Sequence, residues 1–308
     1  MAESFWTVAQ QVLVLFILIG AGFICGKTGL LHEKAVKCLA DLVLYLAFPC
    51  VIIQSFMRKY DPQMLRGLLL AGLISLLVHV GSALLAWLIF RDKDESRRRV
   101  LRFATVFSNA GYMALPLQQA LLGEEGVFYG AAYVAVFNLV LWSYGMVSMS
   151  GDSKSLSAKK LLLNPGVIGI AAGLLVFIFS IPVPEVIAAP IGHLAALNTP
   201  VPMIIIGFYL SQTNLRAALK DGRSYVAIAL RLVAIPVLAI GGMVLCGVRG
   251  TVLISCAVAV SAPVAAAATM FAAKYDQNTL LSANLVSVST LFSVATMPLL
   301  VALTQLVG

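Results

Sequence analysis

Long apolar runs without charged residues recur along the whole chain, and short polar or basic stretches separate them. A run of about 20 apolar residues is long enough to cross the hydrocarbon core of a bilayer as an α-helix. Ten such runs predict an all-α membrane protein with ten transmembrane helices. The predicted spans are Phe5–Gly26, Val36–Met57, Gly67–Phe90, Phe103–Leu122, a fifth that follows the turn Gly123–Gly126 and ends near Ser150, Leu161–Ile181, Ile191–Ser211, Ser224–Val248, Gly250–Ala273 and Asn278–Leu306.

The fourth span departs from the pattern of a plain membrane helix because it contains Asn109, Gly111 and Pro116. Proline has no N–H, its ring clashes with the carbonyl of Tyr112, and it disfavours helical backbone at Leu115. Irregular backbone at membrane depth survives only where it is buried in protein or lines a cavity. In secondary transporters such interrupted helices form the substrate site near mid-membrane. The alternative is a kinked helix in which the Asn109 side chain bonds to a neighbour.

A single offset of 153 residues relates the two halves of the chain. It pairs Gly20 with Gly173, Pro49 with Pro202, Ser108 with Ser261, and Glu125 with Asn278. The same offset places a second interrupted span at Pro263, where a run of alanines allows another segment to approach closely. Because each half has five spans, the second half starts from the opposite side of the membrane, which predicts an inverted repeat. We therefore divide the chain into a first repeat (1–150), a cytoplasmic linker (151–160) and a second, inverted repeat (161–308).

Composition and charge exclude other classes of protein. The chain is 61% hydrophobic and 11% charged, whereas soluble domains carry about 25% charged residues. The net charge of +8 does not indicate nucleic-acid binding, because sixteen of the 21 Lys and Arg lie in the loops of one face and four in those of the other. This asymmetry predicts that both termini lie outside the cytoplasm. The membrane that we expect is a plasma (bacterial inner) membrane. The five cysteines have no metal-binding or disulfide spacing, so neither a metal nor a cofactor is predicted.

The two interrupted spans contain the main candidate substrate-binding residues. Helix N-termini carry unbonded N–H groups and roughly half a positive charge, so two of them at mid-depth predict a carboxylate site without a buried full charge. Asn109 would donate an amide hydrogen bond to that anion. Ser108 and Ser261 are hydroxyl candidates, and the alternative for both is a bond to their own backbone. The remaining candidates in the two breaks are Gly111, Pro116 and Pro263.

Five more polar residues lie inside predicted spans. Arg231 is a substrate-binding candidate because an ionisable residue inside a span is a functional hypothesis. Its alternative is a side chain that snorkels to the cytoplasmic surface or pairs with a carboxylate. His79 and Asp41 are candidates for a proton relay, and their alternatives are a hydrogen-bonded core histidine and a scaffold group near the inner surface. Asn138 and Asn284 either reach the interrupted spans or bridge helices.

Several short motifs follow one another along essentially all 308 residues. They are Gly20-Ala21-Gly22-Phe23, Leu42–Pro49, Ser108-Asn109-Ala110-Gly111, Leu115-Pro116-Leu117, Ser261-Ala262-Pro263, Ala272-Ala273-Lys274-Tyr275, and Ser289-Thr290-Leu291 to Met297-Pro298-Leu299. Their joint order and spacing resemble the auxin efflux carrier family of the bile acid/auxin carrier superfamily. The chain is identified as a bacterial-type member of that family.

This resemblance implies that helices 4 and 9 are unwound and cross near mid-membrane. It implies a scaffold of helices 1, 2, 6 and 7, through which two copies form a homodimer, and a mobile transport domain of helices 3–5 and 8–10. Family substrates are organic anions, such as indole acetate in plants and malate or malonate for bacterial members. Plant carriers have a proline where Thr269 stands here, and charged residues in the third span where Leu68–Ser75 has none.

The predicted function is therefore a secondary transporter of small organic anions, in contact with membrane lipid, that works by elevator-type alternating access. The alternatives are a membrane-embedded enzyme, or an ion-coupled transporter of bile-acid-like compounds or of cations and protons on the same fold. An enzyme would need paired aspartates, a serine beside a histidine or an H-E-x-x-H motif, and no such arrangement is evident in the spans. A passive channel is disfavoured because paired interruptions suit alternating access.

Overall fold

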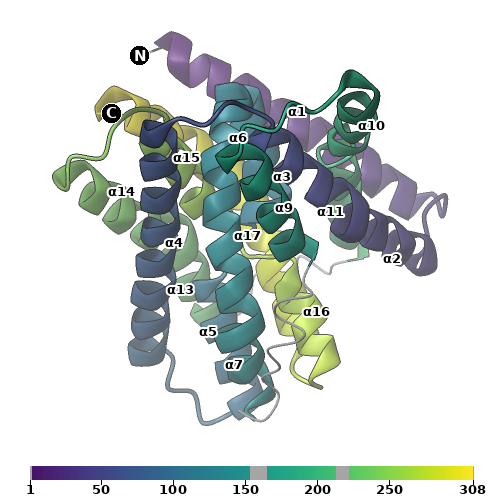
Figure 1. Ribbon diagram of the computed structural model, residues 1–308. Helices are drawn as coiled ribbons and strands as arrows, with labels where there is room; N and C mark the ends of the chain where they lie inside the picture. The colour runs from purple at the N-terminus through teal and green to yellow at the C-terminus, as the bar shows by residue number, and fades with distance from the viewer. Residues whose placement is uncertain (1, 153–164, 213–221, 308) are drawn as a thin grey trace.

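The computed structural model describes residues 2–152, 165–212 and 222–307, and these ranges are built from helices (Figure 1). The helices are α1 (Ala2–Lys27), α2 (Glu33–Leu42), α3 (Phe48–Phe56), α4 (Pro62–Ile89), α5 (Glu95–Val106), α6 (Leu115–Val140), α7 (Met146–Ser150), α9 (Pro165–Ile178), α10 (Glu185–Ala196), α11 (Pro200–Gln212), α13 (Gly222–Ala229), α14 (Ile235–Leu245), α15 (Gly250–Ser261), α16 (Ala267–Lys274) and α17 (Thr279–Val307). Four π-helical turns join some of them: η1 (Val43–Ala47), η2 (Ala110–Ala114), η3 (Leu141–Gly145) and η5 (Leu230–Ala234). Within the described ranges, the only extended pairing is an antiparallel bridge between Ser108 and Val264.

Six helical stretches in the described part of the chain are long and apolar enough to cross a membrane. They are Glu33–Phe56, Pro62–Ile89, Ala110–Ser150, Glu185–Gln212, Gly222–Leu245 and Thr279–Val307, with shorter apolar helices at Leu13–Lys27, Gly166–Ile178 and Gly250–Ser261. The predicted all-α membrane protein is thereby confirmed, whereas the division into ten spans and two inverted repeats stays a prediction. The predicted linker and the start of the sixth span fall mainly on residues 153–164, outside the described ranges.

Gly123 reverses the chain between the predicted fourth and fifth spans. Its backbone is non-helical (φ 64°, ψ −152°), with a positive φ that favours glycine. A Cβ at Gly130 would collide with the side chain of Gln118, although residues this far apart in one straight helix would be separated by about 18 Å. The stretch Ala110–Ser150 therefore consists of two segments that fold back on each other, and the predicted turn at Gly123 is confirmed.

Three prolines inside helices share one local solution, a π-helical turn that ends two residues before the proline. Pro49 follows η1, Pro116 follows η2 and Pro236 follows η5. In each case the N–H of the residue before the proline bonds to the carbonyl five residues back. The wider turn shifts the hydrogen-bond ladder so that the proline ring does not meet the carbonyl it would strike in an α-helix.

The predicted break at Pro116 is therefore wrong. Leu115 keeps helical backbone (φ −58°, ψ −47°), and the helix continues through the proline into α6. The interruption lies earlier, at 107–109, between the end of α5 and the start of η2. The prediction failed because it considered only the α-helical ladder, in which the ring and the carbonyl collide.

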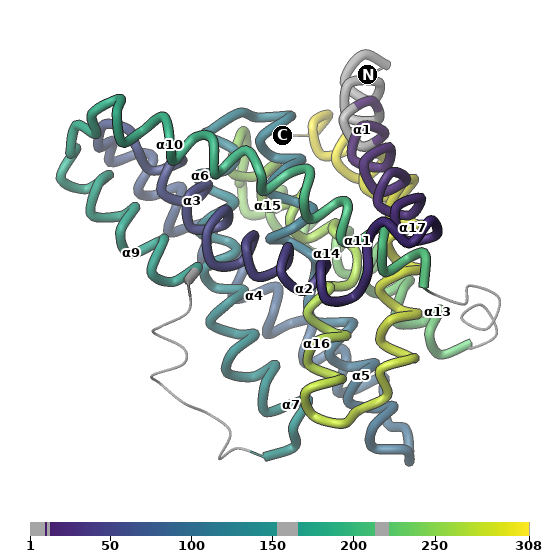
Figure 2. Tube along the Cα trace, turned by 90° about the vertical axis from the view of Figure 1, so that its right-hand side faces the viewer, coloured from purple at the N-terminus to yellow at the C-terminus, as the bar shows by residue number. Residues whose placement is uncertain are grey.

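The first, second, sixth and seventh predicted spans pack in two close pairs, the first with the seventh and the second with the sixth. α1 packs against α11, where Gly22 and Gly207 bring the two backbones together. α3 packs against α9, where Gly169 and Gly173 lie against α3. Small residues permit this approach in membranes, where close packing drives helix association. Figure 2 shows α3, α9 and α10 grouped on one side of the molecule.

The chain termini and the start of the main basic stretch lie at opposite ends of the molecule. Figure 1 places both termini at one end and the connection between α4 and α5 at the opposite end. That connection begins the basic stretch Arg91–Arg102. The separation agrees with the predicted topology, in which the termini and this loop lie on opposite faces of the membrane.

Replacing Gly22 with alanine is expected to destabilise the protein, since a Cβ there would overlap the backbone of Ile204 in α11. Overpacking of this kind costs about 1–3 kcal/mol, so the unfolding temperature in detergent should fall. Gly20→Ala on the same helix is the matched control, because nothing lies within 4 Å of a Cβ at Gly20. Equal unfolding temperatures for the two variants would contradict the close packing of α1 on α11.

Candidate functional site

The two interrupted helices meet at their breaks. The N–H of Asn109 donates to the carbonyl of Pro263 over 2.7 Å, and the N–H of Ala265 donates to the carbonyl of Phe107 over 2.9 Å. These two bonds belong to the antiparallel bridge between Ser108 and Val264. Backbone groups that leave a helix inside a membrane need partners within the protein. Here each break supplies partners for the other.

The second break has a local cause in the sequence. α15 ends at Ser261, and Ala262 is extended (φ −63°, ψ 148°), as is usual for a residue before a proline. The N–H of Val264 donates to the hydroxyl of Ser289 in α17 over 3.1 Å. The predicted interruption at Pro263 is therefore confirmed.

A cavity of about 80 Å³ lies beside the breaks, with η1 and α3 on one side and η2, α6, η3 and α16 around the rest. Its lining combines amide side chains, aromatic rings and aliphatic groups, and none of its lining residues is charged. Three predicted site residues, Asn109, Gly111 and Asn138, are brought together here. The aromatic lining residues are Phe48, Tyr112, Phe137, Trp142 and Phe271.

Asn109 lines this cavity and has an unused hydrogen-bond donor. The residue is 3% exposed, and its Nδ2 atom has no hydrogen-bond partner in the protein. A buried donor left unpaired costs about 1–3 kcal/mol, and an acceptor that reached this amide from the cavity would remove that cost. Asn138 differs, because its Nδ2 already donates to the carbonyl of Val134 over 3.0 Å.

Helix ends set the electrostatic character of the cavity. η2 begins at Ala110 and α16 begins at Ala267, and both Gly111 and Ala267 line the cavity. The first turn of a helix has N–H groups without intrahelical acceptors and carries positive partial charge. Two such turns beside the unpaired amide of Asn109 make a site that favours an anion over a cation.

Arg231 is fully buried and joins the C-terminal ends of α5 and α15. Its Nη1 donates to the carbonyls of Thr105 and Val106 over 3.2 Å each, and its Nη2 donates to the carbonyl of Val260. Carbonyls at a helix C-terminus carry negative partial charge, so a cation is favourable there. The alternative prediction, a snorkelling or carboxylate-paired arginine, is wrong because the guanidinium is not exposed and its partners are carbonyls. Arg231 does not line the cavity.

His79 is buried among aromatic rings and also does not line the cavity. Its Nδ1 donates to the carbonyl of Ser75 over 2.6 Å. The ring centroids of Phe107, Tyr133 and Phe137 each lie 5.8 Å from that of His79. Its Nε2 has no partner in the protein. This geometry is that of a hydrogen-bonded core histidine, and a role in a proton relay stays a prediction.

The remaining candidates lie in varied surroundings. Ser108 and Ser261 are buried, and neither hydroxyl bonds to its own backbone, so that alternative is wrong for both. Asn284 on α17 has a buried Oδ1 without a protein partner and does not line the cavity. Asp41 is exposed on α2 and equally does not line it. Pro116 is buried at the start of α6.

Gln118 positions the interrupted helices, and sequence reasoning missed it. This buried side chain donates from Nε2 to the carbonyl of Ser255 over 2.8 Å, and the hydroxyl of Ser255 donates to the carbonyl of Gly126 over 3.1 Å. The two bonds fix α15 against both arms of the Gly123 turn. A glutamine inside an apolar run was the available signal. The sequence gives no corresponding signal for the aromatic residues that line the cavity, because aromatic residues in membrane spans face lipid as well as protein.

Comparisons with known proteins agree with a membrane transporter. The family model described as "Membrane transport protein" matches residues 7–301. An uncharacterized transporter of Methanothermobacter thermautotrophicus is 25% identical over 294 residues, which cover 94% of this chain and 96% of that protein. An uncharacterized transporter of Methanocaldococcus jannaschii is 25% identical over 292 residues, which cover 92% of this chain and 94% of that protein. Because the family model covers nearly the whole chain, this multi-pass membrane protein belongs to the membrane transport protein family.

Proposed function

We propose that this protein is a secondary transporter of small organic anions, and that the substrate carboxylate binds in the cavity beside the two interrupted helices. One observation carries the proposal: Asn109, whose buried Nδ2 has no protein partner, lines a cavity flanked by two helix N-termini. The family and the relatives support membrane transport. The geometry supports the finer assignment of an anionic substrate.

The chemistry of the lining suits a carboxylate attached to an apolar body. Amide and helix N-terminal N–H groups donate to oxygen atoms, and the aromatic rings offer apolar contact to the rest of the ligand. A bare anion is costly at mid-membrane, and fixed N–H dipoles replace its water without a cation in direct contact. Arg231, bonded to the residues just before both breaks, adds a positive charge to the same region.

The size of the cavity favours a small substrate. Its volume of about 80 Å³ is well below the roughly 300–1,000 Å³ typical of pockets for drug-sized ligands. A short monocarboxylate matches this volume. An auxin-like compound, with its two-ring body, is larger than this volume.

The position of the cavity supports an elevator movement. It lies where Leu44 and Phe48, on the second predicted span, face the two interrupted spans. In the proposed mechanism spans 1, 2, 6 and 7 stay fixed, and spans 3–5 and 8–10 carry the site past them. The packing of α1 on α11 and of α3 on α9 supports the inverted repeat. The first pair joins spans 1 and 7, and the second joins spans 2 and 6. The repeat relates span 1 to span 6 and span 2 to span 7, so it relates one pair to the other.

The proposal includes the bacterial type of the family, a plasma (bacterial inner) membrane and a homodimer through the scaffold helices. It also places both termini outside the cytoplasm. The support for this orientation is the basic stretch Arg91–Arg102, which begins at the end of the molecule opposite to the termini (Figure 1). Lys and Arg concentrate in cytoplasmic loops.

A thermal-shift screen of the purified protein tests the substrate class. Small monocarboxylates are expected to raise the unfolding temperature, because a ligand at a hundred times its Kd stabilises the folded state by about 2.7 kcal/mol. The neutral amide of each acid is the control, since it keeps the shape of the acid without its charge. If the amides stabilise as well as the acids, or no acid stabilises at all, the anion assignment fails. Uptake of the best acid into proteoliposomes then separates transport from binding.

A further inference from the structure

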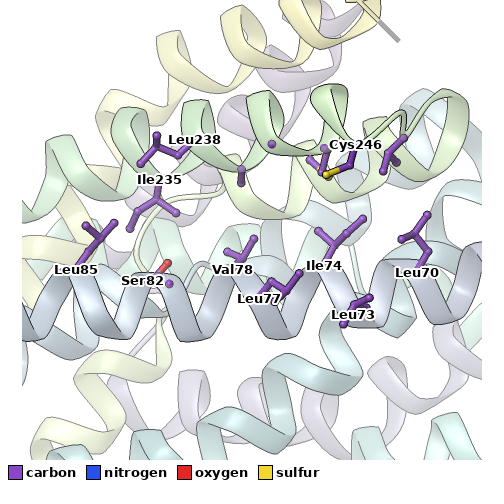
Figure 3. A pocket seen from close by; sticks show the side chains of 15 residues that line it. Leu70, Leu73, Ile74, Leu77, Val78, Ser82, Leu85, Ile235, Leu238 and Cys246 are labelled. Atoms are coloured by element: carbon purple, nitrogen blue, oxygen red, sulfur yellow. The ribbon is translucent and has the colours of Figure 1, made fainter.

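An apolar groove of about 470 Å³ runs between α4 and α14, away from the cavity beside the breaks. Figure 3 shows its two ends: Leu85 lies near Ile235 at one end, and Leu70 lies near Cys246 at the other. The two helices therefore form antiparallel walls. Ser82 is the one hydroxyl in a lining that is otherwise made of aliphatic side chains, glycines, Met243 and Cys246.

The groove has the length of a lipid tail. From Leu70 to Leu85 the helix rises about 22 Å at 1.5 Å per residue, which is most of the roughly 30 Å hydrocarbon core of a bilayer. Leu73 and Leu77 on α4 and Leu238 on α14 are strongly exposed. An extended acyl chain parallel to the helices would cover them.

A polar hollow of about 530 Å³ continues from one end of the groove. Gly67 on α4 lines the hollow one turn before Leu70 lines the groove, and Arg249 follows directly after Val248. The hollow is lined by two basic and two acidic residues: Arg58, Arg249, Asp61 and Glu125. In the proposed topology this is the outer end of the groove.

The guanidinium of Arg249 is held at the junction of groove and hollow. Its Nη1 donates to the carbonyls of Val244 and Val248 over 2.9 and 2.8 Å, while the residue as a whole is exposed. Arg58 is engaged by Glu124 at 3.7 Å. Arg249 is therefore the cation available to a phosphate, with the carboxylates of Asp61 and Glu125 on the same hollow.

We propose that the groove and the hollow together bind one zwitterionic phospholipid with a primary ammonium, of the phosphatidylethanolamine type. One acyl chain lies between α4 and α14, the phosphate contacts Arg249, and the ammonium contacts Asp61 or Glu125. The bilayer is as apolar as the groove, so the tail provides little preference over bulk lipid. Selectivity comes from the headgroup, whose two charges match the two signs of charge in the hollow, and from the three donors of a primary ammonium.

Lipid-dependent thermal stability of the delipidated full-length protein tests this proposal. Three phospholipids with identical acyl chains are compared: one with ethanolamine, one with choline and one with glycerol. The ethanolamine lipid is expected to raise the unfolding temperature most. Arg249→Gln is expected to weaken the apparent affinity for this lipid about tenfold, as loss of a charge-assisted hydrogen bond would. Arg66→Gln, an exposed arginine on α4 that does not line the hollow, is the matched control.

A second pair of variants tests the groove itself. A Cβ at either Gly241 or Gly242 meets nothing within 4 Å, but only Gly242 lines the groove. Gly242→Leu should therefore abolish the preference for the ethanolamine lipid, whereas Gly241→Leu should keep it. Equal stabilisation by all three lipids, unchanged by Arg249→Gln, would mean ordinary bulk lipid and overturn the proposal. A stronger effect of the glycerol lipid would overturn the zwitterionic assignment. If the protein were dimeric and Gly242→Leu alone abolished the dimer, the groove would instead be occupied by a second copy of the chain.

Discussion

Replacing Arg231 with methionine is expected to destabilise the folded protein by about 3 kcal/mol or more. The guanidinium donates to three buried carbonyls at the ends of α5 and α15, and each buried group left unpaired costs about 1–3 kcal/mol. Methionine fills much of the volume but donates nothing. We expect a lower unfolding temperature and a reduced yield of monodisperse protein in size-exclusion chromatography.

Arg102→Met is the matched control for this substitution. Arg102 also donates to carbonyls at a helix end, those of Trp87 and Phe90, but it is partly exposed, so water can replace it. Its loss should lower the unfolding temperature much less. Arg231→Lys should give an intermediate result, because one ammonium keeps the charge but lacks the planar fork of donors. Parental stability of Arg231→Met would show that the guanidinium does not hold the two interrupted helices.

Replacing Asn109 with alanine is expected to weaken substrate binding about ten- to hundredfold. Losing a hydrogen bond to a charged ligand costs about 1.5–3 kcal/mol. The Nδ2 of Asn109 has no partner in the protein, so its removal takes no bond from the unliganded state. The unliganded variant should therefore unfold at the parental temperature or above it. The measurement is titration of the best acid from the thermal-shift screen, followed by its uptake into proteoliposomes.

Asn284→Ala is the control, since Asn284 is an asparagine of a predicted span that does not line the cavity. It should leave the affinity for the acid unchanged. The site assignment would fail if Asn109→Ala bound and transported every tested carboxylate as the parent does. It would also fail if Asn109→Ala unfolded at a much lower temperature, because the amide would then stabilise the folded protein and not only the bound substrate.

The class of the protein and the second interruption could be predicted from the sequence because their causes are local. Apolar runs of membrane length require only counting, and Pro263 acts on the residue just before it. The first interruption could not be placed in this way. Phe107 and Asn109 leave the helix where they pair with Ala265 and Pro263, more than 150 positions away, and no proline marks the point. Pro116 misled the prediction because a π-helical turn, which depends on cooperation among several residues, accommodates it.

The residues that line the cavity could not be predicted, because an apolar sequence does not show which side of a helix faces a cavity. Asn138 and Asn284 both lie in predicted spans, yet only Asn138 lines the cavity. Which side of a helix faces a cavity is set by its rotation against neighbouring helices. In a membrane both the lipid face and the protein face are apolar, so periodicity gives little guidance. Trp142 and Phe271 therefore could not be distinguished from aromatic residues that meet lipid.

The attachment of Arg231 determines how a membrane potential acts on the proposed movement. Arg231 is bonded to α5 and α15, so in the proposed movement it would travel with the interrupted helices. With a bound monocarboxylate, the arginine and the substrate are electrically neutral together, whereas the empty site carries one positive charge. Moving one charge through the whole potential is worth about 2.3 kcal/mol per 100 mV. A negative-inside potential would therefore have little effect on the movement of the loaded site, which is neutral. It would favour the inward position of the empty, positively charged site. The potential would thus favour export of the substrate.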